Sequence, residues 1–175
     1  MYSERISTAS LVSGRRGVIK KEEFKKKIKT KRVLIDTEVL SGIFEFFVSN
    51  GMRESACLLR GKIEGEHLLI TDFHKCDHSV GTKTTVTIKP SEFARANKDD
   101  GLYVVGAAHS HPGLTVFLSS IDKETHRRFQ QIFPDYVSMV MDPFHKEGIS
   151  FKFYRLENSR EKEIGFDYLV GVENV

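Results

Sequence analysis

The most apolar segment of the chain is LYVVGAAHSH, residues 102–111. Its first part is almost entirely hydrophobic, which predicts a buried strand, and Pro112-Gly113 ends it. Side chains two positions apart on a strand point to the same face. His109 and His111 therefore present both imidazoles on one side, at the end of the strand predicted to be the most deeply buried.

The residues that follow bring a carboxylate toward these imidazoles. Residues 112–118 read as a short loop, and Ser119 is a good first residue for the helix predicted over SSIDKETHRRFQQIF, which Pro134 ends. Asp122 then lies in the first turn of that helix. Two imidazole nitrogens and one carboxylate oxygen suit Zn²⁺ and leave a fourth tetrahedral position for water.

Each part of this pattern also has a less specific explanation. A His-x-His pair alone is often an incidental exposed pair, and Ser119 with Asp122 alone fits a capping box, whose side chains satisfy free N–H groups at a helix start. Metal binding gives one reason why polar residues end the most apolar strand. The remaining histidines lack the spacing that places His109 and His111 on one face of a strand. They are interpreted as surface residues: His67, His74, His78, His126 and His145.

A hydrolytic metal site also needs a proton acceptor that is not a metal ligand. Glu54 opens the otherwise apolar segment ESACLL, where a carboxylate is costly unless it has a partner. A solvent-facing strand end explains this residue equally well. Glu54 is therefore a candidate general base.

The rest of the chain alternates between helix and strand patterns. A helix is predicted between Asp36, a good N-cap, and Asn50-Gly51, a natural C-cap, and Ser91 is expected to start another. Gly65-Glu66 predicts a hairpin turn, and residues 166–172 fit either a strand or a helix. The strand patterns occupy residues 33–35, 54–64, 67–76, 85–89, 102–111, 136–141 and 148–156. This mixture predicts an α/β or α+β domain with a central sheet covered by helices.

Length and composition narrow the protein class. The chain has 175 residues, 39% hydrophobic and 29% charged, as expected of one soluble globular domain. No segment approaches the roughly 18 apolar residues of a membrane-spanning helix, and the first residues lack the apolar core of a secretory signal. Two cysteines, Cys57 and Cys76, indicate a reducing, cytoplasmic setting, and a bridge between them is the less favoured alternative.

The net charge of +3 is unevenly distributed. Residues 15–32 contain ten Lys and Arg against Glu22 and Glu23, so the remainder of the chain is net acidic. We divide the chain into a basic N-terminal extension, 1–31, and one folded domain, 32–175. A solvated or partly helical tail is the favoured interpretation of the extension, ahead of an arm that contacts nucleic acid or an acidic partner.

Together, these residues resemble the signature of the JAMM, or MPN-plus, metalloproteases. That signature is a Glu on an early strand, then H-x-H-P, then ten residues (here 112–121) before an Asp, closed by S-x-x-D. RESACLLRG (53–61) resembles the Glu-bearing strand, and SMVMDP (138–143) resembles the family's strand ending in Asp-Pro. The resemblance covers about residues 33–156. It implies an MPN-like fold, a central mixed β-sheet curved around and flanked by helices, with a cytidine-deaminase-like architecture.

The resemblance implies a role for each matched position. His109, His111 and Asp122 match the zinc ligands. Glu54 matches the residue that takes a proton from the zinc-bound water and later passes it to the leaving amine. Ser119 matches the hydroxyl that helps to stabilise the oxyanion of the tetrahedral intermediate.

The family's substrates are ubiquitin or ubiquitin-like proteins joined through a C-terminal diglycine to a lysine. The resemblance therefore implies a zinc-dependent isopeptidase with a groove beside the metal for an extended tail, bordered by residues 81–88 or 112–118. A proteasome or similar proteolytic complex is an expected partner, whereas nucleic acid and membranes are not. The motif resembles proteasome-lid and endosome-associated deubiquitinases, and the compact size resembles prokaryotic, in particular archaeal, members.

Two other functions fit the same motif. One is a peptidase that trims an adduct of a sulfur-carrier or ubiquitin-like protein, which keeps the metal site and changes the substrate. The other is a non-catalytic MPN scaffold. Scaffold members typically lack the ligands, whereas this chain has all five matched positions, so an active enzyme is the favoured interpretation.

Overall fold

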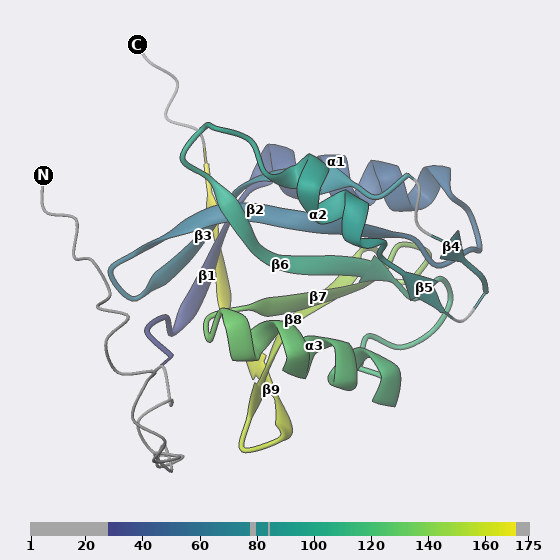
Figure 1. Cartoon of the computed structure of the whole chain (residues 1–175). Coiled ribbons are helices and arrows are strands. Elements are labelled where there is room, and N and C mark those ends of the chain that lie inside the picture. Colours follow the sequence, from purple (N-terminus) through teal and green to yellow (C-terminus); the bar gives the residue numbers. More distant parts are fainter. Residues whose placement is uncertain (1–27, 78–79, 84, 171–175) are drawn as a thin grey trace, which may run out of the picture.

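An eight-stranded mixed sheet organises the fold (Figure 1). The computed structural model describes residues 28–77, 80–83 and 85–170. The strands of the sheet are β1 (Arg32–Asp36), β2 (Ala56–Glu64), β3 (His67–Lys75), β6 (Tyr103–Ser110), β7 (Val137–Asp142), β8 (Ser150–Glu157), β9 (Arg160–Ile164) and β10 (Phe166–Leu169). Their order is β10-β1-β3-β2-β6-β7-β8-β9, and β4 (Val80–Gly81) pairs separately with β5 (Val86–Thr87). The predicted central sheet is confirmed.

Helices cover both faces of this sheet. They are α1 (Thr37–Ser49), α2 (Pro90–Ala96) and α3 (Ser120–Ile132). Phe47 of α1 lies in the main core with Cys57 and Leu59 of β2, whereas Leu58 faces the other way and packs with Ala96 of α2. None of these helices is long and apolar enough to cross a membrane in the part of the chain that the structure describes.

The predicted helix and hairpin boundaries follow from local capping chemistry. Asp36 caps α1 by accepting a hydrogen bond of 2.8 Å from the backbone of Glu38. Asn50 ends the helix, and Gly51 follows with φ 63°, a left-handed conformation that glycine adopts at little cost. Gly65, with φ 57°, forms the turn between β2 and β3. These sequence predictions are confirmed.

Three features of the fold differ from the sequence-based prediction or complete it. The helix expected to start at Ser91 begins at Pro90, because the fixed φ of proline and its missing N–H suit the first position of a helix. Within the segment 166–172, which fitted strand or helix, Phe166–Leu169 forms β10 parallel to β1. Strand β9 was not predicted, since REKEI has no alternating apolar pattern and is a strand through its pairing with β8.

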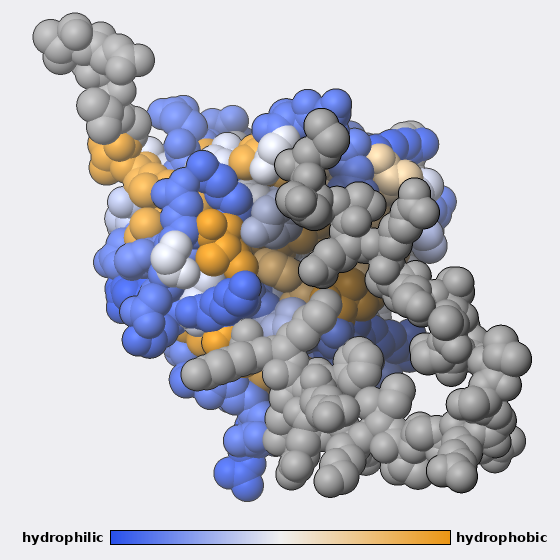
Figure 2. All heavy atoms as spheres, turned by 60° about the vertical axis from the view of Figure 1, so that its left-hand side comes forward, coloured by the Kyte–Doolittle hydropathy of each residue, from blue (hydrophilic) through white to orange (hydrophobic). Residues whose placement is uncertain are grey.

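The two end strands of the sheet are consecutive in the chain. Only Gly165 separates β9 from β10, yet these strands occupy opposite ends of the strand order, so the sheet is curled. The Phe151 and Phe166 rings, from β8 and β10, lie 4.8 Å apart inside this curl. Figure 2 shows the face of the molecule that lies on the left in Figure 1. The coloured residues on this face are largely hydrophilic, with apolar groups scattered among charged ones. The curl therefore brings Phe166 of the end strand β10 against the aromatic residues of β8.

Buried polar residues correct two expectations from the sequence. His126 was interpreted as a surface residue but is only 1% exposed, because Ser138 of β7 and Gln130 offer hydrogen-bond partners at 2.7 Å to its two ring nitrogens. His74 is half-buried and lies 2.8 Å from the Glu92 carboxylate. His67 and His145 are exposed, as expected, and His78 falls outside the described residues.

Both cysteines are buried, and neither forms a disulfide. The less favoured alternative of a Cys57–Cys76 bridge is therefore absent from the structure. Burial raises the pKa of the Cys57 thiol well above its ordinary value, and the neighbouring Cys76 adds to this effect. A thiol held protonated in this way is a core group and a poor nucleophile.

The segment before β1 is fixed to the body of the domain. The Asp135 carboxylate accepts hydrogen bonds from the backbone N–H groups of Lys29 and Thr30 and from the Thr30 hydroxyl. Arg155, fully buried, donates to the Thr30 carbonyl, the Thr30 hydroxyl and the Asp135 carbonyl. The rest of the basic extension, residues 1–27, lies outside the described residues, and the division at 31/32 stays a prediction.

Removing the Asp135 carboxylate should destabilise the protein strongly. Asp135→Ala leaves the buried Arg155 guanidinium without its nearest carboxylate, and breaking a buried pair typically costs about 3–5 kcal/mol. We expect urea unfolding to report a loss of this order. Asp167→Ala is the matched control, because it breaks the exposed Arg32–Asp167 pair, where a much smaller loss is expected. Equal losses for both variants would contradict the structural role of the buried network.

His126 should make stability depend on pH in a defined window. Burial lowers the pKa of His126 from 6.5 to about 4, so the folded protein holds fewer protons than the unfolded chain between these values. The free energy of unfolding should therefore fall as the pH drops from 6.5 to 4, by at most about 3 kcal/mol. Urea unfolding across this range should show a shallower slope for His126→Asn, while His145→Asn, at an exposed histidine, should keep the wild-type slope. An unchanged slope in His126→Asn would refute the assignment.

Candidate metal centre

The two predicted histidine ligands lie at the end of β6. Pairing with β2 on one side and with β7 on the other fixes this strand, with His109 opposite Ala56 and Val140. Both imidazoles are buried, and their Nε2 atoms lie 3.1 Å apart. The expected placement of both rings on one face of the strand is confirmed.

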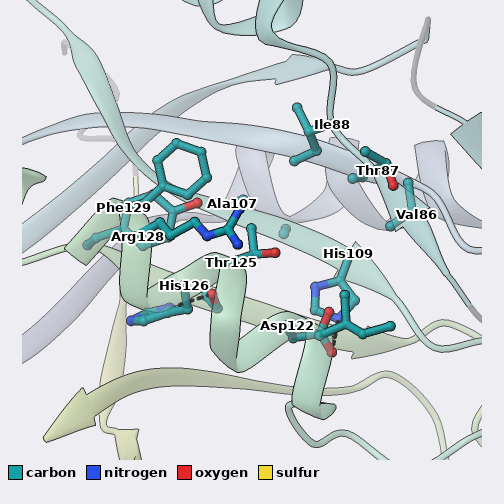
Figure 3. Close-up of a pocket in the computed structure, with 15 residues that line it drawn as sticks. Val86, Thr87, Ile88, Ala107, His109, Asp122, Thr125, His126, Arg128 and Phe129 are labelled. Carbon is teal, nitrogen blue, oxygen red and sulfur yellow. Dashed lines mark hydrogen bonds and ion pairs between the residues drawn. The ribbon is translucent and has the colours of Figure 1, made fainter. Parts of the chain in front are cut away.

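Asp122 faces the imidazole of His109 from the first turn of α3 (Figure 3). Its Oδ2 atom lies 3.4 Å from Nε2 of His109 and 3.9 Å from Nε2 of His111. The same oxygen accepts a hydrogen bond of 2.8 Å from the backbone of Ser119, while the Ser119 hydroxyl accepts one of 3.2 Å from the backbone of Asp122. The capping box and the candidate metal centre therefore share one carboxylate.

Electrostatics favours the ligand forms of Asp122 and His111. Burial raises the pKa of Asp122, but hydrogen bonds from His109 and Ser119 and the charge of His109 outweigh it, so the carboxylate stays ionised. Burial and the nearby His109 lower the pKa of His111, which keeps its imidazole neutral at neutral pH. Metal ions bind ionised carboxylates and neutral imidazoles.

The geometry of the three side chains fits a zinc ion. Their ligand atoms all lie within 4.8 Å of one another. Tetrahedral ligands about 2.0–2.2 Å from zinc lie roughly 3.3–3.6 Å from each other, close to the separations found here. His109, His111 and Asp122 can thus hold one ion with a position left for water.

The ring of His111 is fixed from behind. Its Nδ1 donates a hydrogen bond of 3.2 Å to the Thr115 carbonyl, which leaves Nε2 to face the site. The Asp142 carboxylate accepts hydrogen bonds from the backbones of Gly113 and Phe144 and so holds the start of the same loop. The sequence could not reveal the Thr115 contact, because a carbonyl carries no residue-specific signal. The role of Asp142 could have been inferred from the sequence, because this carboxylate lies at the end of an apolar strand.

Glu54 lies beside the candidate ligands and is only 5% exposed. Its Oε1 atom lies 3.8 Å from Nε2 of His111. Burial raises the pKa of Glu54 to about 7, and the Asp122 charge adds to this against the opposing effect of His109. The alternative of a solvent-facing strand end is wrong, since the carboxyl group is buried and β2 begins two residues later.

A cavity of about 310 Å³ opens beside the candidate metal ligands His109 and Asp122 (Figure 3). His109 and Asp122 line one end, and α3 forms a wall that continues through Thr125 to Phe129. Residues 86–88 line the opposite side. Of the two segments expected to border a groove, 81–88 therefore contributes, and no lining residue of this cavity comes from 112–118.

Comparison with known proteins gives matches over most of the described chain. The family profile described as "JAB1/Mov34/MPN/PAD-1 ubiquitin protease" matches residues 28–135. An AMSH-like protease from Mus musculus is 32% identical over 67% of this chain and 28% of its own length. The COP9 signalosome complex subunit 5b of Arabidopsis thaliana is 33% identical over 65% of this chain and 34% of its own. The chain thus spans about a third of the length of these relatives.

A solved structure shows the same fold at low sequence identity. The solution structure of protein DSY2949 from Desulfitobacterium hafniense matches with a TM-score of 0.67 and 16% identity, over 81% of this chain and 95% of the other. The family profile covers more than half of the chain, and the signature residues converge on one site. The chain therefore belongs to the JAB1/Mov34/MPN/PAD-1 family, and its JAMM motif is assembled in the fold.

Proposed function

We propose that this protein is a zinc-dependent isopeptidase that cleaves ubiquitin or a ubiquitin-like protein from a lysine. The observation that carries the proposal is the convergence of three ligand atoms within 4.8 Å beside a buried carboxyl group that is not one of them. A scaffold has no need to bury Glu54 next to such a cluster, because an unpaired buried carboxylate is costly. The names of the relatives, among them a protease and a ubiquitin protease family, support this function.

The ligand residues supply the electrophilic part of the site. A zinc ion held by His109, His111 and Asp122 would acidify a water ligand and polarise the scissile carbonyl. The Thr115 carbonyl orients His111, and the Ser119 backbone orients Asp122. The ligands are thus held before substrate arrives, which lowers the reorganisation needed for the reaction.

Glu54 is the residue that we assign to proton transfer. A general base works best when its pKa lies near the operating pH, and burial places the pKa of Glu54 at about 7. The carboxylate can accept a proton from the attacking water and then donate it to the departing lysine amine. Its position next to His111, outside the ligand set, fits this role.

Ser119 is assigned to the developing negative charge. A hydroxyl carries one proton and two lone pairs, so Ser119 can accept from the Asp122 backbone and still donate to a substrate oxygen. Removing one such donor typically costs on the order of 10²-fold or more in rate. The N-terminus of α3 adds a favourable dipole at the same place.

The cavity beside the ligands suits an extended, slender peptide tail. The small side chains of Ala56 and Ala107 line it near the proposed metal ligands, which favours residues without side chains such as a diglycine. Residues 86–88 border it from the β4–β5 pair, where a tail can add a strand. We therefore assign the C-terminal tail of a ubiquitin-like protein to this cavity. A cytoplasmic setting and a proteasome-like partner complex stay predictions.

Separate metal and base variants test the mechanism. His109→Ala should lose both bound zinc and cleavage, whereas Glu54→Gln should keep about one zinc per chain and lose about 10²–10⁴-fold in kcat. Metal analysis of the purified protein, paired with cleavage of an isopeptide-linked ubiquitin conjugate, measures both. Glu92→Gln is the control, because it neutralises an equally buried carboxyl group on α2 and should keep kcat. Full activity of metal-free protein would sink the proposal.

A comparison of substrates distinguishes the isopeptidase from the alternative peptidase. Wild-type protein should release a ubiquitin-like modifier from a lysine side chain faster than it trims an amino acid from the C-terminus of a sulfur-carrier protein. The ratio of the two kcat/KM values measures this preference. A higher kcat/KM for the carrier adduct would favour the peptidase, and cleavage of neither substrate by zinc-loaded protein would favour the scaffold.

A further inference from the structure

Ser110 lies between the two histidine ligands on β6 and points away from them. Alternation along the strand sends its side chain to the opposite face, where it is fully buried. Its hydroxyl oxygen accepts a hydrogen bond of 3.0 Å from the backbone of Ser55 and lies 3.3 Å from the Ser55 hydroxyl. The Ser110 backbone in turn donates to the Ser55 carbonyl at 2.9 Å. Ser55 is therefore joined to Ser110 through both backbone and side chain.

Ser55 is the residue next to Glu54, where the regular pairing of the sheet stops. Strand β2 begins only at Ala56, so the ladder between β2 and β6 does not itself hold Glu54. The Ser55–Ser110 bonds extend the contact between the two segments by one residue. They end directly beside the proposed general base.

The other side of Glu54 is held by the segment of β4. The Glu54 backbone donates a hydrogen bond of 2.8 Å to the Thr82 carbonyl. At Gly81, an added Cβ would lie 2.0 Å from the Glu54 carbonyl oxygen, so only glycine permits this approach. Glu54 is thus clamped between Ser110, through Ser55, and the Gly81-Thr82 segment.

We propose that Ser110 and Gly81 are positioning residues that set the distance between Glu54 and the metal ligands. This inference rests on the proposed function, in which Glu54 transfers protons. Proton transfer requires heavy atoms within about 2.6–3.2 Å, and a misplacement of about 1 Å can cost on the order of 10²-fold in rate. The ligands are fixed independently, by the pairing of β6 with β2 and β7 and by the α3 cap. Loss of the clamp should displace the base and spare the metal.

Ser110→Ala tests this separation of roles. The substitution removes the acceptor of the Ser55 N–H and should lower kcat by about 10–100-fold, with bound zinc and KM unchanged. Ser110→Thr keeps a hydroxyl at the same position and should recover most of the loss. Gly81→Ala disturbs Glu54 from the other side without touching β6, and it should give the same pattern. It keeps the test decisive if Ser110→Ala does not fold.

A double-mutant cycle distinguishes positioning from a general effect on the fold. If Ser110 and Gly81 act through Glu54, neither variant should reduce kcat further when it is combined with Glu54→Gln. Thr30→Ala is the control, because it removes a buried hydroxyl beside Asp135, before the start of β7, whereas the site lies beside the end of that strand. This control should keep kcat within about twofold of wild type and remain additive with Glu54→Gln.

The possible outcomes separate the two proposals. Undiminished kcat in Ser110→Ala and Gly81→Ala, loss of zinc in either variant, or full additivity with Glu54→Gln would overturn the positioning role while wild-type cleavage stands. Failure of zinc-loaded wild-type protein to cleave any conjugate would overturn the proposed function and the positioning role with it. Reduced kcat with zinc retained and no additivity supports both.

Discussion

One carboxylate oxygen of Asp122 connects the start of a helix with the end of a strand. It accepts the Ser119 N–H that a helix start leaves unpaired, and it also lies 3.4 Å from the imidazole of His109. Since one atom serves both contacts, a helix that began one residue earlier or later would lose its cap and the third ligand together. The loop of residues 112–118 therefore has to deliver α3 at a fixed position. Its attachment to Asp142 and to His111 explains how it does so.

The buried charges of the domain fall into two groups with different roles. Away from the site, Arg60 is paired with Asp72 and Asp100, and Arg155 lies against Asp135, so each buried cation has carboxylate partners. At the site, two carboxyl groups are close together, and their environments drive their pKa values apart. The pKa of Asp122 falls and that of Glu54 rises to about 7. This divergence separates a candidate ligand that stays ionised from a group able to exchange protons near neutral pH.

The parts of the site that were predictable from sequence depend on short-range geometry. The shared face of His109 and His111 follows from strand alternation, and the position of Asp122 follows from the capping box with Ser119. The caps of α1 and the β2–β3 turn were readable for the same reason. Resemblance to a known family added the roles, which spacing alone left open.

The features that escaped prediction depend on contacts between distant segments. His126 lies on a polar helix, and its contacts with Ser138 and Tyr136, outside that helix, help to bury it. The segment β9 is a strand because its backbone pairs with the edge of β8. Gly81 and Thr82 pack against the backbone of Glu54 and help to bury it. No residue near Glu54 in the sequence predicts this contact. Periodicity describes a segment alone, so it cannot supply these partners.

The strand order explains why Glu54, just before β2, meets the candidate ligands from β6 and α3. Because β2 and β6 are antiparallel neighbours, the start of β2 lies beside the end of β6, and Glu54 arrives next to His109 and His111. Because β6 and β7 are parallel, α3 must return the chain to the far end of the sheet, so the helix starts where β6 stops. The positions of the candidate ligands and the proposed base thus depend on the sheet, whereas the cavity wall at Val86 and Thr87 belongs to the separate β4–β5 pair. Substitutions in that pair can change the cavity wall while the sheet keeps the candidate ligands and the proposed base in place.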